Sequence, residues 1–206
     1  MTELRYRLLG RTGLRVSELF LGAMTFGDPD TVGAEPEECR RILDAYAEAG
    51  GNVVDTAINY RGGASESILG ELLEGRRDRF VVSTKYTVSR DGSDPNAAGN
   101  HRKNLRLSLD TSLRRLRTDY IDLYWVHLWD AHTPIEETMR ALDDVVRDGK
   151  VLYLSASRTH PCGSSPTPTP SLPSTVAPIH GAPSALQPLA ARHRTRAPPR
   201  WHTSLA

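Results

Sequence analysis

The chain has 206 residues, enough to bury one substantial core. Its formal net charge of +1 argues against a nucleic-acid or membrane partner. The two cysteines, Cys39 and Cys162, belong to no CxxC pair, which argues against a disulfide framework and against a zinc site. No apolar run approaches roughly 18 residues, and the N-terminus lacks the apolar segment of a signal peptide, so we expect a cytoplasmic protein.

The first part of the chain predicts a hairpin, a strand and a helix. Residues 6–9 and 14–16 flank the turn sequence GRTG, a pattern typical of a β-hairpin. Residues 19–22 (LFLG) are the first candidate strand of a sheet. A helix can begin at Pro36 and is ended by the two glycines at 50 and 51. Apolar residues recur between them at helical spacing: Cys39, Ile42, Leu43, Tyr46 and Ala47.

The next segment predicts a strand, a helix and a second strand. Residues 52–54 predict a short buried strand that ends at Asp55. Ser65 is expected to cap a helix that Gly75 ends. Residues 80–84 predict the next strand, which delivers Lys85.

The following segment repeats the pattern twice more. After a polar loop at 89–99, we expect a long amphipathic helix from Asn100 to Leu116. Its arginines are expected to form a solvated face rather than a binding patch: Arg102, Arg106, Arg114, Arg115 and Arg117. Residues 121–126 predict a strand, a helix follows from Pro134 to the glycine at 149, and residues 151–154 begin a fifth strand.

Strands that alternate with helices predict an α/β fold with a parallel sheet and right-handed crossovers. Periodicity by itself leaves two architectures open, an open doubly wound sheet and a closed barrel. In a closed barrel of this kind, catalytic groups lie at the carboxyl ends of the strands.

Four residues of catalytic type stand at or just beyond these strand ends. They are Asp55, Tyr60, Lys85 and His127. Singly, each has an ordinary structural explanation: a turn cap, a half-buried aromatic, a solvated strand end and a structural histidine. Together, at three successive strand ends, they predict one site.

Long stretches around these residues closely resemble the aldo-keto reductases. The stretches are LGRTGLRVSELFLGAMTFG near the N-terminus, DTAINY, STK and DLYWVHLWD. The resemblance implies a (β/α)8 TIM barrel, of which only the first half is present: the N-terminal hairpin, four βα units and the start of strand five. It also implies an oxidoreductase that reduces the carbonyl of a small aldehyde or ketone with hydride from NADPH.

The same resemblance implies a role for each of the four residues. Tyr60 matches the general acid that gives a proton to the carbonyl oxygen. A free tyrosine has a pKa of about 10, and a nearby ammonium group, the role of Lys85, stabilises the phenolate. Asp55 would pair with Lys85 and orient it, and His127 would hydrogen-bond the substrate oxygen.

Cofactor contacts are implied in the same way. Gly22, Ala23 and Met24 are expected beside the nicotinamide, and Ser157 falls where a serine after strand five contacts the carboxamide. Trp129 is expected to line the substrate pocket, with core packing as the alternative. No metal site is expected.

The chain changes character after residue 157. Residues 1–157 carry all 25 acidic residues against 21 lysines and arginines, and ten of the 14 prolines lie beyond them. We therefore divide the chain into a partial barrel at 1–157 and a Pro/Ser/Thr/Arg-rich tail at 158–206 that is expected to be disordered. Residues 155–161 can be encoded so that another reading frame gives Gly-Val-Ser-Asp-Thr-Pro, which resembles the loop after strand five of the family. A frameshift near residue 155 explains this, and a genuine linker is the alternative; the nucleotide sequence decides between them.

Three functions remain open from the sequence. The chain is a reductase by its resemblance to the family. It could instead be an inactive truncated fragment of such an enzyme, because half a barrel leaves strand edges unpaired. A non-catalytic interaction module is the third, and retention of all four catalytic residue types argues against it.

Overall fold

The computed structural model of the protein describes residues 4–27 and 32–156. The expected disorder of the tail, the frameshift and the cofactor contact of Ser157 lie outside these residues, as does Cys162. Among the described residues, no helix is long and apolar enough to cross a membrane.

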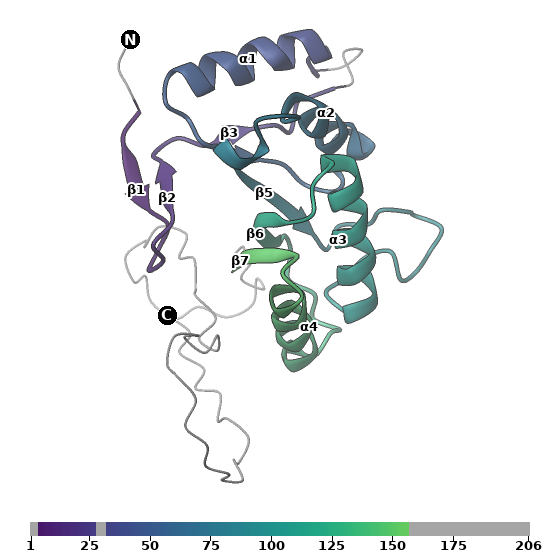
Figure 1. Cartoon of the computed structure of the whole chain (residues 1–206). Helices are drawn as coiled ribbons and strands as arrows, with labels where there is room; N and C mark the ends of the chain where they lie inside the picture. The colour runs from purple at the N-terminus through teal and green to yellow at the C-terminus, as the bar shows by residue number, and fades with distance from the viewer. Residues whose placement is uncertain (1–3, 28–31, 157–206) are drawn as a thin grey trace, which may run out of the picture.

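The fold consists of a hairpin and a five-stranded parallel sheet (Figure 1). Strands β1 (Tyr6–Leu8) and β2 (Arg15–Ser17) pair antiparallel as predicted. The sheet has the order β3-β4-β5-β6-β7, so each strand pairs with the next one along the chain. Its strands are β3 (Leu21–Gly22), β4 (Val53–Asp55), β5 (Val81–Tyr86), β6 (Ile121–Val126) and β7 (Val151–Ala156). This sequential order is that of a barrel wall and confirms the predicted half barrel.

The α-helices connect the strands and gather on one side of the sheet (Figure 1). They are α1 (Pro36–Glu48), α2 (Ala64–Leu72), α3 (Arg102–Leu116) and α4 (Ile135–Arg147). Short 3-10 helices, η1 (Tyr60–Gly63) and η2 (Arg77–Arg79), precede α2 and β5. The main core lies between helices and sheet, where Val54, Val82 and Tyr124 pack against Leu105 and Leu109 of α3.

The opposite face of the sheet is partly covered by the hairpin. Leu9 and Val16 pack there against Val53, Val81 and Leu123 of three adjacent strands. Because side chains alternate along a strand, these strands send every second residue towards this face. Asp55 and Lys85 follow Val53 and Val81 at even spacing, so they belong to the same face, nearer the carboxyl ends of the strands.

Two predicted helix starts are wrong. Ser65 does not cap α2, whose N-cap is Gly63; the Ser65 hydroxyl is buried and bonds Thr56 Oγ1 and Ala23 O, both at 2.7 Å. Asn100 precedes α3, whose N-cap is His101. In both cases a polar residue suited to a cap bridges neighbouring loops instead.

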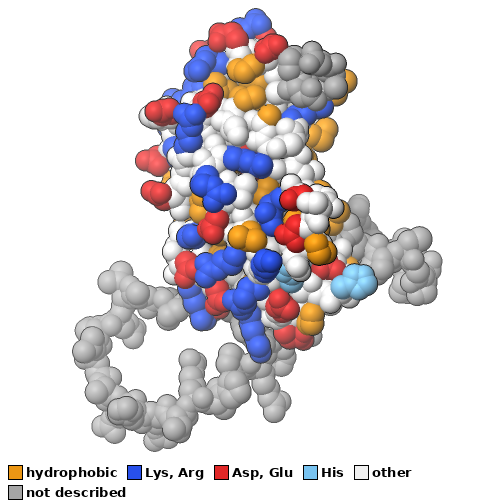
Figure 2. All heavy atoms as spheres, turned by 90° about the vertical axis from the view of Figure 1, so that its right-hand side faces the viewer, with side chains coloured by type: hydrophobic (Ala, Val, Ile, Leu, Met, Phe, Trp, Pro, Cys, Tyr) orange, Lys and Arg blue, Asp and Glu red, His pale blue; other side chains and the backbone are white. Residues whose placement is uncertain are grey.

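The arginines of α3 are mostly solvated but are not a free basic patch. Figure 2 shows basic and acidic side chains interspersed over this side of the molecule. Arg102 and Arg106 pair with Asp144 and Asp148 near the end of α4. Arg115 departs from the prediction, because it pairs with the fully buried carboxylate of Glu66.

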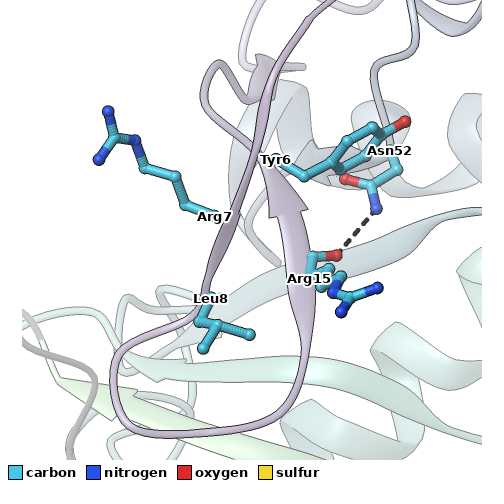
Figure 3. Close-up of a pocket in the computed structure, with 5 residues that line it drawn as sticks. All are labelled: Tyr6, Arg7, Leu8, Arg15 and Asn52. Atoms are coloured by element: carbon cyan, nitrogen blue, oxygen red, sulfur yellow. Dashed lines mark hydrogen bonds between the residues drawn. The ribbon is translucent and has the colours of Figure 1, made fainter.

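An open cavity of about 530 Å³ lies beside the hairpin (Figure 3). Tyr6, Arg7 and Leu8 of β1 line it together with Arg15 and Asn52, and the Asn52 amide donates to Arg15 O at 3.0 Å. Asn52 directly precedes β4, so the cavity lies at the amino end of the strands. It is therefore at the end of the sheet opposite to the predicted catalytic residues.

Candidate active site

The register of the sheet brings the predicted residues to one edge. Gly22 is opposite Asp55, Asp55 is opposite Ser83, and Lys85 is opposite Trp125. His127 follows the last residue of β6, and its backbone N–H donates to Tyr86 O at 3.2 Å. The carboxyl ends of β4, β5 and β6 thus carry Asp55, Lys85 and His127 side by side.

Lys85 is the centre of this group. Its ammonium donates to Asp55 Oδ2 at 2.5 Å and to the backbone oxygen of Thr56 at 2.7 Å. Only 12% of the Lys85 side chain and 25% of the Asp55 side chain are exposed. Charge-assisted bonds of this kind, largely shielded from water, fix the direction of the lysine side chain.

Tyr60 comes to the group from the loop after β4. It begins the turn η1, and its ring centroid lies 5.1 Å from Lys85 Nζ. The rings of Tyr60 and His127 meet edge to face, with centroids 6.1 Å apart and planes at 79°. All four predicted catalytic residues therefore lie within one cluster.

His127 is half-buried beside two charged groups. Burial and the positive charge of Lys85 lower the pKa of His127 from its ordinary 6.5, and the carboxylate of Asp55 partly opposes them. The imidazole is therefore neutral near pH 7. Its Nδ1 is buried and has no hydrogen-bond partner among residues 4–27 and 32–156.

Ser83 and Trp125 extend the hydrogen-bond network around Asp55, and neither residue was predicted from the sequence. The Ser83 hydroxyl donates to Asp55 Oδ1 at 2.6 Å, and the indole N–H of Trp125 donates to Ser83 Oγ at 2.9 Å. Because an indole can only donate, it directs the serine proton to the carboxylate. The alternation of side chains along β5 could have indicated Ser83, because it lies two residues before Lys85 and therefore faces the same side of the sheet.

The residues expected beside a nicotinamide stand at the same edge. Gly22 ends β3, and a Cβ added to it would meet no atom within 4 Å. Ala23 is fully buried and its N–H donates to Asp55 O at 2.8 Å, whereas the Met24 side chain is 57% exposed. Open space therefore adjoins the backbone of Gly22, close to the candidate catalytic residues.

Comparison with known proteins identifies relatives. The sequence model of the aldo/keto reductase family matches residues 18–162. A norsolorinic acid reductase of Aspergillus flavus is 46% identical over 165 residues, covering 75% of this chain and 42% of that protein. An NADP(+) aryl-alcohol dehydrogenase of Phanerodontia chrysosporium is 44% identical over 161 residues, covering 71% of this chain and 42% of that protein.

A solved structure is similar as well. It is an aldo-keto reductase from Bacillus halodurans in its holo form, 33% identical, with a TM-score of 0.66. The match covers 76% of this chain and 51% of the other. The chain thus spans less than half the length of the two enzymes above and about half of this structure.

Proposed function

Because the chain belongs to the aldo/keto reductase family, we propose that its site reduces the carbonyl of an aldehyde or ketone with NADPH. The observation that carries the proposal is the position of the Lys85 ammonium, 2.5 Å from Asp55 Oδ2 and 5.1 Å from the centre of the Tyr60 ring. An acid supported by a cation that is itself held by a carboxylate suits proton transfer to oxygen.

Tyr60 is the proposed general acid. Its hydroxyl donates the proton to the substrate oxygen as negative charge develops there. The Lys85 ammonium stabilises the phenolate that this step leaves behind. Asp55 and the Thr56 carbonyl occupy hydrogen-bonding positions of that ammonium, so it reaches the tyrosine from one fixed direction.

His127 is proposed to orient the substrate. The lowered pKa of His127 keeps the ring neutral near pH 7, so one nitrogen donates and the other accepts. A neutral donor beside Tyr60 can hydrogen-bond the carbonyl oxygen without delivering a proton of its own. Tyr60 therefore supplies the transferred proton, and His127 aligns the carbonyl.

The described residues suit only the nicotinamide end of the cofactor. When bound, NADPH supplies the hydride. Gly22 leaves open space beside Asp55, so Gly22 and Met24 would border the ring, whereas Ala23 is fully buried and would not contact it. By resemblance, the groups that hold the phosphates belong to later barrel loops, which residues 4–27 and 32–156 do not include. We therefore expect the 206-residue chain alone to bind NADPH weakly.

The proposed substrates are aromatic carbonyl compounds. Exposed apolar side chains surround the catalytic end: Met24, Leu128 and Trp129 are 57%, 45% and 48% exposed. Such a rim favours an apolar ring over a sugar or a charged acid. The aryl alcohols in the name of one relative agree with that choice.

A chimera tests the proposal. Residues 1–156 are joined to the remaining part of the Phanerodontia relative, and NADPH consumption is followed with a substituted benzaldehyde. We expect turnover by the chimera, no turnover by the chain alone, and loss of turnover with retained NADPH binding in the Tyr60→Phe chimera. A Tyr60→Phe chimera as active as its parent would contradict the proposed acid.

A further inference from the structure

A buried ion pair lies behind the turn that carries Tyr60. The Glu66 side chain of α2 is fully buried, and Arg115 of α3 approaches its Oε2 at 3.3 Å. Thr84 donates to the other carboxylate oxygen at 2.8 Å. A carboxylate out of water needs such partners, so the arginine neutralises a charge between the helices and the sheet.

Arg115 also reaches the backbone on both sides of Tyr60. Its Nη1 donates to Ile58 O at 2.8 Å, and its Nη2 makes a longer bond to Gly62 O at 3.5 Å. The N–H of Ile58 donates in turn to Lys85 O at 3.1 Å. The peptide two residues before Tyr60 is thus held between Lys85 and Arg115.

The turn after Tyr60 has an unusual backbone that needs such support. Arg61, Gly62 and Gly63 have φ angles of 50°, 62° and 100°, three left-handed residues in succession. A left-handed conformation is unfavourable for a residue with a side chain, which Arg61 has. A Cβ on Gly63 would lie 2.2 Å from Arg115 Cζ, so the guanidinium packs directly on the turn.

We propose that Arg115 is a positioning residue for Tyr60, and this inference rests on the proposed role of Tyr60 as the acid. The planar guanidinium donates in several directions at once, to Glu66 and to the two carbonyls. A lysine supplies the same charge, but its ammonium lacks the planar arrangement of several donors. The hydrogen bonds of the guanidinium fix the turn after Tyr60, and the turn in turn holds the Tyr60 ring against Lys85 and His127.

A charge-retaining substitution separates positioning from simple neutralisation of Glu66. Arg115→Lys keeps a cation near the carboxylate, so we expect its thermal midpoint to stay close to that of the parent. Two hydrogen-bonded amides of the turn, those of Tyr60 and Gly62, should exchange with solvent about tenfold faster or more, since hydrogen bonds to a charged donor are lost. The nuclear Overhauser contact between the rings of Tyr60 and His127 should weaken.

The neighbouring arginine provides a matched control. Arg114 is exposed, and its guanidinium bonds Thr111 Oγ1 at 3.1 Å. Arg114→Lys should leave the exchange of the turn and the ring contact unchanged. Glu66→Gln should also leave the ring contact in place, because Arg115 keeps both of its backbone carbonyls.

Arg115→Lys with unchanged turn exchange and an intact ring contact would overturn the proposal. If that variant does not fold, a measurement on the parent protein still tests the proposal. The guanidinium of Arg115 should then show restricted rotation and slow exchange by nitrogen NMR, and free rotation like that of Arg114 would overturn the proposal. None of these measurements uses cofactor or substrate, so failure of carbonyl reduction is a separate result.

Discussion

Lys85 Nζ lies 2.5 Å from Asp55 Oδ2, across two adjacent parallel strands. Asp55→Asn removes the charge that this ammonium faces in a largely shielded place. We expect a loss of about 1.5–3 kcal/mol in the free energy of unfolding, the range for hydrogen bonds to charged groups. Urea denaturation of both proteins measures it.

The control for this change is an ion pair within one helix whose cation, unlike Lys85, is exposed. Asp143→Asn breaks the contact with Arg147 one turn along α4, where the arginine is 70% exposed. It should cost no more than about 0.5 kcal/mol, because such pairs are screened by water and salt. Equal losses in the two variants would mean that the Lys85–Asp55 pair is an ordinary surface contact.

Close packing of α2 on α3 predicts a second effect. A Cβ on Gly70 would lie 2.2 Å from Arg115 O, a backbone atom that cannot move aside easily. Gly70→Ala should therefore destabilise the protein by about 1–3 kcal/mol or more, despite the better helix propensity of alanine. Gly92→Ala is the control, since its Cβ would meet nothing within 4 Å, and its thermal midpoint should match the parent.

The strongly periodic parts of the fold could be predicted from the sequence. Each predicted strand and α-helix is present, because apolar periodicity reports the face that must be buried. Ser65 and Asn100 were misassigned because a capping residue and a buried bridging residue have the same chemistry. Only the structure distinguishes them, through contacts to parts of the chain far away in sequence.

The grouping of the candidate residues was predictable from the sequence, but the contacts that support them were not. Asp55, Lys85 and His127 were predicted because each lies at or next to the carboxyl end of a predicted strand. The left-handed turn after Tyr60 was not predicted, because Arg61 has no local preference for φ 50° and depends on neighbours that include α3. Support of this kind comes from tertiary contacts that local sequence patterns do not reveal.

The lowered pKa of His127 predicts a pH dependence of stability. Because burial and Lys85 disfavour the imidazolium in the folded protein, the unfolded chain binds more protons below its ordinary pKa of 6.5. Stability should therefore fall as the pH drops through 6.5, and the loss should be complete below the folded-state pKa. Denaturation midpoints of the parent and His127→Gln, compared across this range, isolate the effect. A parent that loses no more stability than the variant would contradict it.

The Trp125–Ser83–Asp55 chain supports the last prediction. Ser83→Ala leaves both the indole N–H and Asp55 Oδ1 without the partner they have now, at a fully buried position. We expect a loss of about 1–3 kcal/mol in unfolding free energy, because buried groups are left unpaired. The indole proton of Trp125 should shift in the NMR spectrum, because it loses its acceptor.

Ser155→Ala is the matched control for this change. Ser155 lies opposite Trp125 on β7 and is buried, yet within the described part of the chain its Oγ has no hydrogen-bond partner. Removing an unpaired buried hydroxyl should be neutral or slightly stabilising. It should also leave the hydrogen bond from the Trp125 indole to Ser83 intact. If both serine variants behave alike, the Ser83 hydroxyl does not link Asp55 to Trp125, and the carboxylate is oriented by Lys85 alone.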